Sequence, residues 1–234
     1  MYMSKLYVIG DSFATGFQQD KHFGALEPEK ERSFPNLIAK HINYECVNTA
    51  KVRYNNKQIF EGAKLFKPKE KDIVIVSWSS PYRDIDEKKA ITQHVEHVIE
   101  IEKYFRDNNL LQVAAFSPLV PYEINSDELI EIYNSKTYLG WGKPNNTLID
   151  YATDRFLSDS KKNIQRLSGV NAKVFLGLIK PRKYKFLTKC YHFNHVGHLK
   201  VANLVYEELR ERFSFLRRSR HAQIEHIPPS PTLI

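Results

Sequence analysis

The feature of this sequence that most limits its possible folds is a regular alternation of short apolar runs and helical patterns. The clearest run, Asp72–Trp78, is apolar without interruption from Ile73 to Val76, which is typical of a strand buried on both faces of a sheet. The clearest helical pattern follows it over Lys88–Asn108. Strands that alternate with helices in this way predict a parallel sheet with helices on both faces.

The remaining segments extend this alternation over most of the chain. We therefore predict a three-layer α/β/α sandwich with a mostly parallel sheet of about five strands, in a single domain over residues 1–216. Residues 118–170 break the rhythm and are expected to form a cap-like insertion, and residues 217–234 are expected to form a basic, proline-rich flexible tail. The predicted strands are Lys5–Ile9, Tyr44–Asn48, Asp72–Trp78, Leu111–Phe116 and Asn171–Ile179; the predicted helices are one that opens at Ser33–Asn36, Gln58–Phe66, Lys88–Asn108 and Gly197–Phe213.

Composition narrows the class of protein. The formal net charge of +8 favours contact with an anionic partner, but no nucleic-acid motif accompanies it, so nucleic-acid binding is not expected to be the main role. Two cysteines give no disulfide framework. No signal peptide is visible, and no apolar run approaches the roughly 20 residues of a membrane-spanning helix. These features predict a soluble, cytoplasmic protein.

A glycine-flanked turn follows the first predicted strand and presents a serine. The turn reads Gly10-Asp11-Ser12 and continues to Gly16. Open α/β sheets bind their ligands at the carboxyl ends of the strands, where this turn is expected to lie. Ser12 is therefore a candidate nucleophile, provided that a base can take its proton.

The order of several motifs along the chain resembles the SGNH (GDSL) hydrolase family. Gly10-Asp11-Ser12 resembles the first block of that family, and Asn48-Thr49-Ala50 with Asn55-Asn56 resembles the second. The strand that ends at Trp78 precedes the place of the third block, and His192–His198 before a closing helix resembles the last. The run Trp78–Arg83 is similar to a divergent branch found in phage and other mobile-element proteins. The resemblance implies a flavodoxin-like arrangement and a serine hydrolase that forms an acyl-enzyme, with no cofactor and no metal.

The same resemblance implies that Ser12 attacks the acyl carbon and that His192 acts first as base and then as acid. His195 and His198 are rivals for that role, although a polar or capping role near the start of the closing helix suits both. Three histidines with this spacing could instead hold a zinc ion. His94 and His97, three residues apart on a mostly charged helix face, are expected to be solvated.

The sequence also departs from the family pattern at three places. Lys189 and Cys190 occupy the positions where an Asp usually precedes the catalytic His, which leaves a Ser–His dyad or a carboxylate from Asp150, Asp154 or Asp159. Arg53 occupies the place of the second-block glycine, where its backbone N–H could still donate to an oxyanion. The third-block Asn is missing, so the candidates for the oxyanion hole or for substrate binding are Arg53, Asn55, Asn56, Ser79, Ser80 and Arg83. Arg83 could bind an anionic substrate group or pair with Asp84 or Asp86.

Two functions remain open from the sequence. The first is a serine ester hydrolase, an esterase or O-deacylase that acts on a small acyl ester or an acylated glycan. The alternative is a catalytically eroded relative that uses the pocket or the basic surface to bind an anionic partner.

Overall fold

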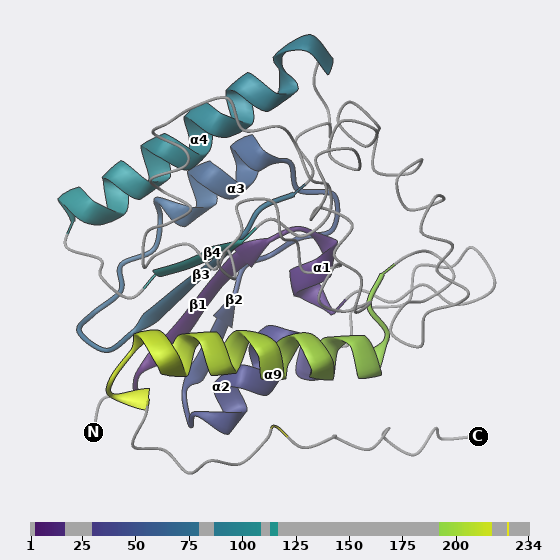
Figure 1. The fold of residues 1–234 in the computed structure, drawn as a ribbon, viewed down its shortest axis with the longest axis vertical. Coiled ribbons are helices and arrows are strands. Elements are labelled where there is room, and N and C mark those ends of the chain that lie inside the picture. The colour runs from purple at the N-terminus through teal and green to yellow at the C-terminus, as the bar shows by residue number, and fades with distance from the viewer. Residues whose placement is uncertain are drawn as a thin grey trace.

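The computed structural model describes residues 3–16, 30–79, 87–108, 113–116, 192–216 and 224 (Figure 1). The elements in chain order are β1 (Lys5–Gly10), α1 (Ser12–Thr15), the 3₁₀ turn η1 (Lys30–Arg32), α2 (Phe34–His41), β2 (Glu45–Asn48), α3 (Asn56–Ala63), β3 (Ile73–Ser77), α4 (Glu87–Asp107), β4 (Val113–Phe116) and α9 (His195–Arg212).

These strands form one parallel sheet in the order β2-β1-β3-β4. The register pairs Tyr7 of β1 with Val47 on one side and with Val74 on the other. This order is the first part of the flavodoxin-like arrangement, in which the chain reverses direction across the sheet after β2. The switch point lies between β1 and β3, and ligands of such sheets bind at its carboxyl end. The predicted fifth strand, Asn171–Ile179, lies outside the described residues.

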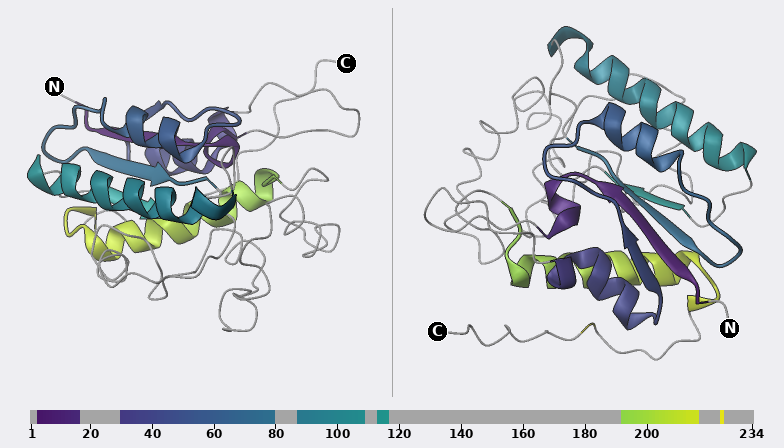
Figure 2. Two further views of the ribbon diagram at one scale, coloured as in Figure 1. Left: turned by 90° about the horizontal axis from the view of Figure 1, so that it is seen from above. Right: turned by 180° about the vertical axis from the view of Figure 1, so that it is seen from behind.

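Helices cover both faces of the sheet, as predicted. Figures 1 and 2 show α2 and α9 on one face and α3 and α4 on the other. Alternate residues of β3 face opposite ways, because Ile73 and Ile75 join the core with α2 and α9, whereas Val74 and Val76 join the core with α3 and α4. The uninterrupted apolar run of β3 therefore fills two cores, which is why it lacks the alternation of a half-exposed strand.

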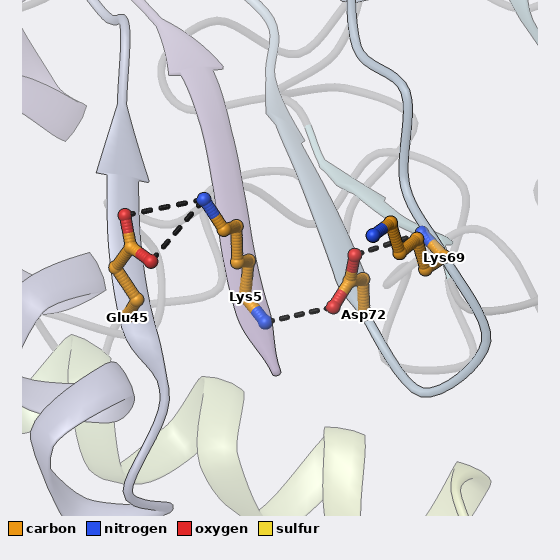
Figure 3. Close-up of polar contacts among 4 residues, drawn as sticks. All are labelled: Lys5, Glu45, Lys69 and Asp72. Carbon is orange, nitrogen blue, oxygen red and sulfur yellow. Dashed lines mark hydrogen bonds and ion pairs between the residues drawn. The ribbon is translucent and has the colours of Figure 1, made fainter. Parts of the chain in front are cut away.

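The amino-terminal edge of the sheet is held by a polar cluster (Figure 3). The Asp72 carboxylate, 2% exposed, accepts the backbone N–H of Lys5 at 2.8 Å and that of Lys69 at 2.8 Å. The Lys5 ammonium lies 3.2 Å from the Glu45 carboxylate across the neighbouring strand. These contacts tie β2, β1 and β3 together at the edge opposite to the one where Ser12 lies.

The element boundaries differ from the prediction by up to three residues, the largest difference being the end of α3 at Ala63 where Phe66 was predicted. Helix α3 begins at Asn56, two residues before the predicted start, because Asn55 and Gln58 form a reciprocal capping box. The predicted turn after β1 contains one helical turn, α1. The predicted insertion lies outside the described residues, as does the predicted tail except for Ile224. That residue is buried, and its backbone N–H donates to Asn203 of α9 at 2.8 Å. Among the described helices, none has the length and apolar character to cross a membrane.

Candidate active site

Ser12 lies at the switch point of the sheet, directly after β1. Asp11 caps α1, because its side chain accepts the N–H of Phe13 at 3.0 Å, and this cap turns the chain sharply at Ser12. Gly10 makes the turn possible: a Cβ at this position would lie 2.7 Å from the Ser77 Cβ and 3.0 Å from that of Ala14. The glycine therefore lets β3 and α1 approach the end of β1 closely, and Ser12 is held where they meet.

His192 reaches Ser12 from the far end of the chain. The His192 Nε2 lies 2.8 Å from the Ser12 Oγ, although 180 residues separate the two. This is hydrogen-bond distance, and the tautomer with a proton on Nδ1 would accept the serine proton at Nε2. Of the three histidines that the sequence offers as partners, His192 is the one that the structure brings to the serine.

The residue after each member of this pair is a buried phenylalanine. The rings of Phe13 and Phe193 meet edge to face at 5.1 Å, and the His192 ring stacks on Phe13 at 5.1 Å. Phe193 is completely buried. Directly after it, the Asn194 side chain accepts the N–H of Gly197 at 2.9 Å and caps α9. The segment with His192 is thus fixed by a buried ring and a capped helix, and the aromatic pair aligns it with Ser12.

The other two histidines of this segment have different surroundings. His195 is exposed at the first residue of α9. His198 is 1% exposed, lies between the rings of Phe34 and Phe193, and accepts the backbone N–H of Phe34 at its Nδ1 at 3.3 Å. Within the part of the chain that the structure describes, no three metal-ligating side chains gather. The histidine spacing in the sequence therefore does not correspond to a shared site among these residues.

The loop between β2 and α3 packs against the Ser12 turn. The Lys51 N–H donates to the Gly10 carbonyl at 3.1 Å, and the Asn48 amide donates to the Ala14 carbonyl at 2.8 Å. Arg53 follows in a turn closed by the Tyr54 N–H on the Lys51 carbonyl at 3.2 Å. Its φ of 69° is left-handed, a backbone that favours glycine and costs other residues about 1 kcal/mol or more. Arg53 thus adopts a backbone conformation that glycine takes more readily.

Ser79 and Asn56 form a buried polar pair beside the turn. The Asn56 side chain accepts the Ser79 N–H at 2.8 Å and donates to the Ser79 carbonyl at 3.1 Å. The Ser79 hydroxyl donates to the buried Asp11 carboxylate at 2.8 Å. Both donors of Ser79 are therefore engaged inside the protein. Asn55 is engaged in capping α3, as described above.

His94 completes this network. The prediction that His94 is solvated is wrong, because its side chain is buried. Its ring is 1% exposed, its Nδ1 lies 2.9 Å from the Asn56 amide nitrogen, and it meets Trp78 edge to face. The sequence held a signal for this burial, because His94 lies four residues before Val98, on the buried stripe that continues to Ile101 and Phe105. The network Asp11–Ser79–Asn56–His94 joins the ends of β1 and β3 to α3 and α4. Sequence reasoning did not find it, because no motif marks it.

Several predicted site residues lie outside the described residues. These are Ser80, Arg83, the acid positions Lys189 and Cys190, and the candidate substitutes Asp150, Asp154 and Asp159. The described part of the site therefore consists of Ser12, His192, the Arg53 loop and the network beneath them.

Comparisons with known proteins find similarity among solved structures. A scan of protein-family models gives no match, and no curated protein matches the chain. Among similar solved structures is a protein of the G-D-S-L family from Desulfitobacterium hafniense, 15% identical with a TM-score of 0.46 over 90% of this chain and 99% of that one. A carbohydrate acetylesterase from Sinorhizobium meliloti is 11% identical with a TM-score of 0.45 over 90% and 100%. A family two carbohydrate esterase from Clostridium thermocellum is 12% identical with a TM-score of 0.49 over 91% and 65%. Similarity at this level carries no argument about activity.

We expect the two buried histidines to make the fold sensitive to acid. Burial lowers the pKa of His94 and of His198 from 6.5 to about 3, so both stay neutral in the folded protein. Below about pH 6.5 the unfolded chain binds protons that the folded chain does not, so the free energy of unfolding decreases by up to about 1.4 kcal/mol per pH unit for each histidine until about pH 3. Urea midpoints between pH 7 and pH 4.5 measure this slope. A urea midpoint that is flat over this range would contradict the expectation.

Proposed function

We propose that this protein is a serine ester hydrolase, an esterase or O-deacylase that works through an acyl-enzyme on Ser12. The observation that carries the proposal is the 2.8 Å approach of the His192 Nε2 to the Ser12 Oγ at the switch point of the sheet. A serine next to a base, at the place where parallel sheets bind ligands, is the arrangement that nucleophilic acyl transfer needs.

The first half of the reaction forms the acyl-enzyme. The Ser12 oxygen attacks the ester carbonyl carbon while His192 takes the hydroxyl proton at Nε2. The carbonyl oxygen becomes an oxyanion in the tetrahedral intermediate. When the intermediate collapses, the bond to the alcohol oxygen breaks, and His192 gives its proton to that oxygen.

The second half releases the acid. Water loses a proton to His192 and attacks the acyl carbon, and the second tetrahedral intermediate breaks the bond to Ser12, which recovers its proton from His192. The backbone N–H groups of Ser12 and Arg53 are the proposed oxyanion donors. Among the described residues neither amide has a hydrogen-bond acceptor, whereas both donors of Ser79 are engaged.

The proposed substrates are small acyl esters or acylated glycans, the class implied by the resemblance of the motifs. The family's usual Asp before the histidine is replaced at Lys189 and Cys190. We therefore propose that Ser12 and His192 act as a dyad, or with a carboxylate from the segment 118–170. In the serine proteases, changing the triad acid to its amide lowers the rate by about four decades, so a dyad is expected to be slow.

Labelling by a fluorophosphonate tests the proposal directly. We expect a fluorophosphonate to modify Ser12, since such probes phosphonylate serines that a base activates. The probe should be small, because Ser12 is only 2% exposed. Intact-mass spectrometry and peptide mapping would locate the modification, and Ser12→Ala should remove it. A folded protein that is never labelled would favour the alternative of an eroded relative that only binds an anionic partner.

A further inference from the structure

We propose that Arg53 makes the protein selective for esters whose acyl part carries an anionic group such as a carboxylate. The inference rests on the proposed function and adds a substrate class to it. Its basis is the position of a guanidinium that has no partner among the described residues, on the loop that packs against the Ser12 turn.

The hydrogen bonds of the loop set how far Arg53 can be from the nucleophile. The Lys51 N–H lies 3.1 Å from the carbonyl oxygen of Gly10, which is two residues before Ser12. Arg53 is two residues beyond Lys51, at most about 7 Å of extended chain, and the turn between them is closed at 3.2 Å. An arginine side chain spans a similar distance. The guanidinium can therefore reach an acyl chain attached to Ser12, particularly when the backbone N–H of Arg53 donates a hydrogen bond to the carbonyl oxygen of that acyl group.

The charges around Arg53 favour an anion from outside the protein. Residues 49–60 contain the cations Lys51, Arg53 and Lys57 and no acidic residue. Arg53 is exposed, and within the described ranges its guanidinium makes no hydrogen bond or ion pair. The Lys51 ammonium lies 5.6 Å from the centre of the Tyr54 ring, so it stays on the same loop. A planar guanidinium with five donors is well matched to a carboxylate.

The backbone at Arg53 permits a clean test. With φ at 69°, glycine fits this position better than arginine does, so Arg53→Gly removes the side chain without deforming the turn. It also keeps the backbone N–H that we propose as an oxyanion donor. A change in substrate preference in this variant would therefore come from the lost guanidinium.

The experiment compares two esters with acyl chains of equal length, p-nitrophenyl butyrate and mono-p-nitrophenyl succinate. The readout is the ratio of kcat/KM for the succinate to kcat/KM for the butyrate within each variant. We expect the unmodified protein to prefer the succinate and Arg53→Gly to lower the ratio about tenfold. Arg53→Lys should keep part of the preference, because lysine retains the positive charge but lacks the paired donors of the guanidinium. Salt should weaken the preference, as for any exposed ion pair. Lys67→Gln, an exposed lysine in the loop before β3, is the charge-matched control and should keep the ratio.

Two outcomes would overturn the inference, and they are distinguishable. If the unmodified protein hydrolyses neither ester in a way that depends on Ser12, the proposed function fails and the inference fails with it. If hydrolysis depends on Ser12 but the ratio is the same in Arg53→Gly as in the unmodified protein, the proposed function stands and the selectivity of Arg53 is refuted.

Discussion

Ser12→Ala should lower kcat for p-nitrophenyl ester hydrolysis at least about a thousandfold, because it removes the oxygen atom that lies 2.8 Å from the His192 Nε2. The loss should appear in kcat rather than in KM, since the alanine still leaves room for the ester and removes only the bond-forming oxygen. Steady-state kinetics with a short-chain p-nitrophenyl ester measure the loss, with equal concentrations of folded protein for the variant and the unmodified chain.

Ser77→Ala is the matched control for this variant. Ser77 pairs with Gly10 in the sheet register, is completely buried, and its hydroxyl has no hydrogen-bond partner among the described residues. Replacing an unpaired buried hydroxyl by hydrogen is close to neutral, so the variant should fold and remain active. Hydrolysis at the same rate in Ser12→Ala and Ser77→Ala would refute the assignment of Ser12 as nucleophile.

Asn56→Ala should lower the free energy of unfolding by about 3–5 kcal/mol, since one truncation removes three buried hydrogen-bonding contacts. The Asn56 side chain, 5% exposed, pairs with the Ser79 N–H, the Ser79 carbonyl and the His94 Nδ1. Urea unfolding followed by circular dichroism measures the loss.

Asn55→Ala supplies the comparison at the neighbouring residue of the same type. The Asn55 side chain is half-buried and accepts one hydrogen bond, from the Gln58 N–H at 2.9 Å, so losing this helix cap should cost about 1 kcal/mol. Two adjacent asparagines are thus expected to differ several-fold in their contribution to stability. Equal losses in the two variants would show that the buried network contributes nothing beyond an ordinary cap.

The layers of the fold could be predicted because buried faces of strands and helices require apolar residues at regular spacings in the sequence. The uninterrupted apolar run of β3 predicted a strand that is buried on both faces, and the helical spacing of apolar residues predicted α4. The start of α3 was misplaced because several polar residues in this segment could act as its N-cap. In the structure Asn55 is the N-cap and forms the capping box with Gln58. The one-turn helix α1 is too short to have a period at all.

The candidate site was predictable only where its chemistry is carried by single residues. Ser12 was identified by its position after the first strand and His192 by the resemblance of its motif to the last block of the SGNH (GDSL) family, and the structure brings the two residues to 2.8 Å. The pairing of His94 with Asn56 was missed, because the two residues are 38 positions apart and nothing local marks the pair. The aromatic contact of Phe13 with Phe193 was missed for the same reason, since each residue alone looks like ordinary core.

That aromatic contact has a consequence for how the protein becomes active as it folds. Ser12 and His192 are 180 positions apart, so their meeting belongs to the most non-local contacts of the chain and requires α9 to have docked on α2 and β1. A chain that has been synthesised only as far as residue 191 holds Ser12 without His192. Under the proposed function, ester hydrolysis would therefore report the completion of folding: activity should return during refolding no earlier than the burial of Phe193, the residue next to His192 whose ring packs on Phe13.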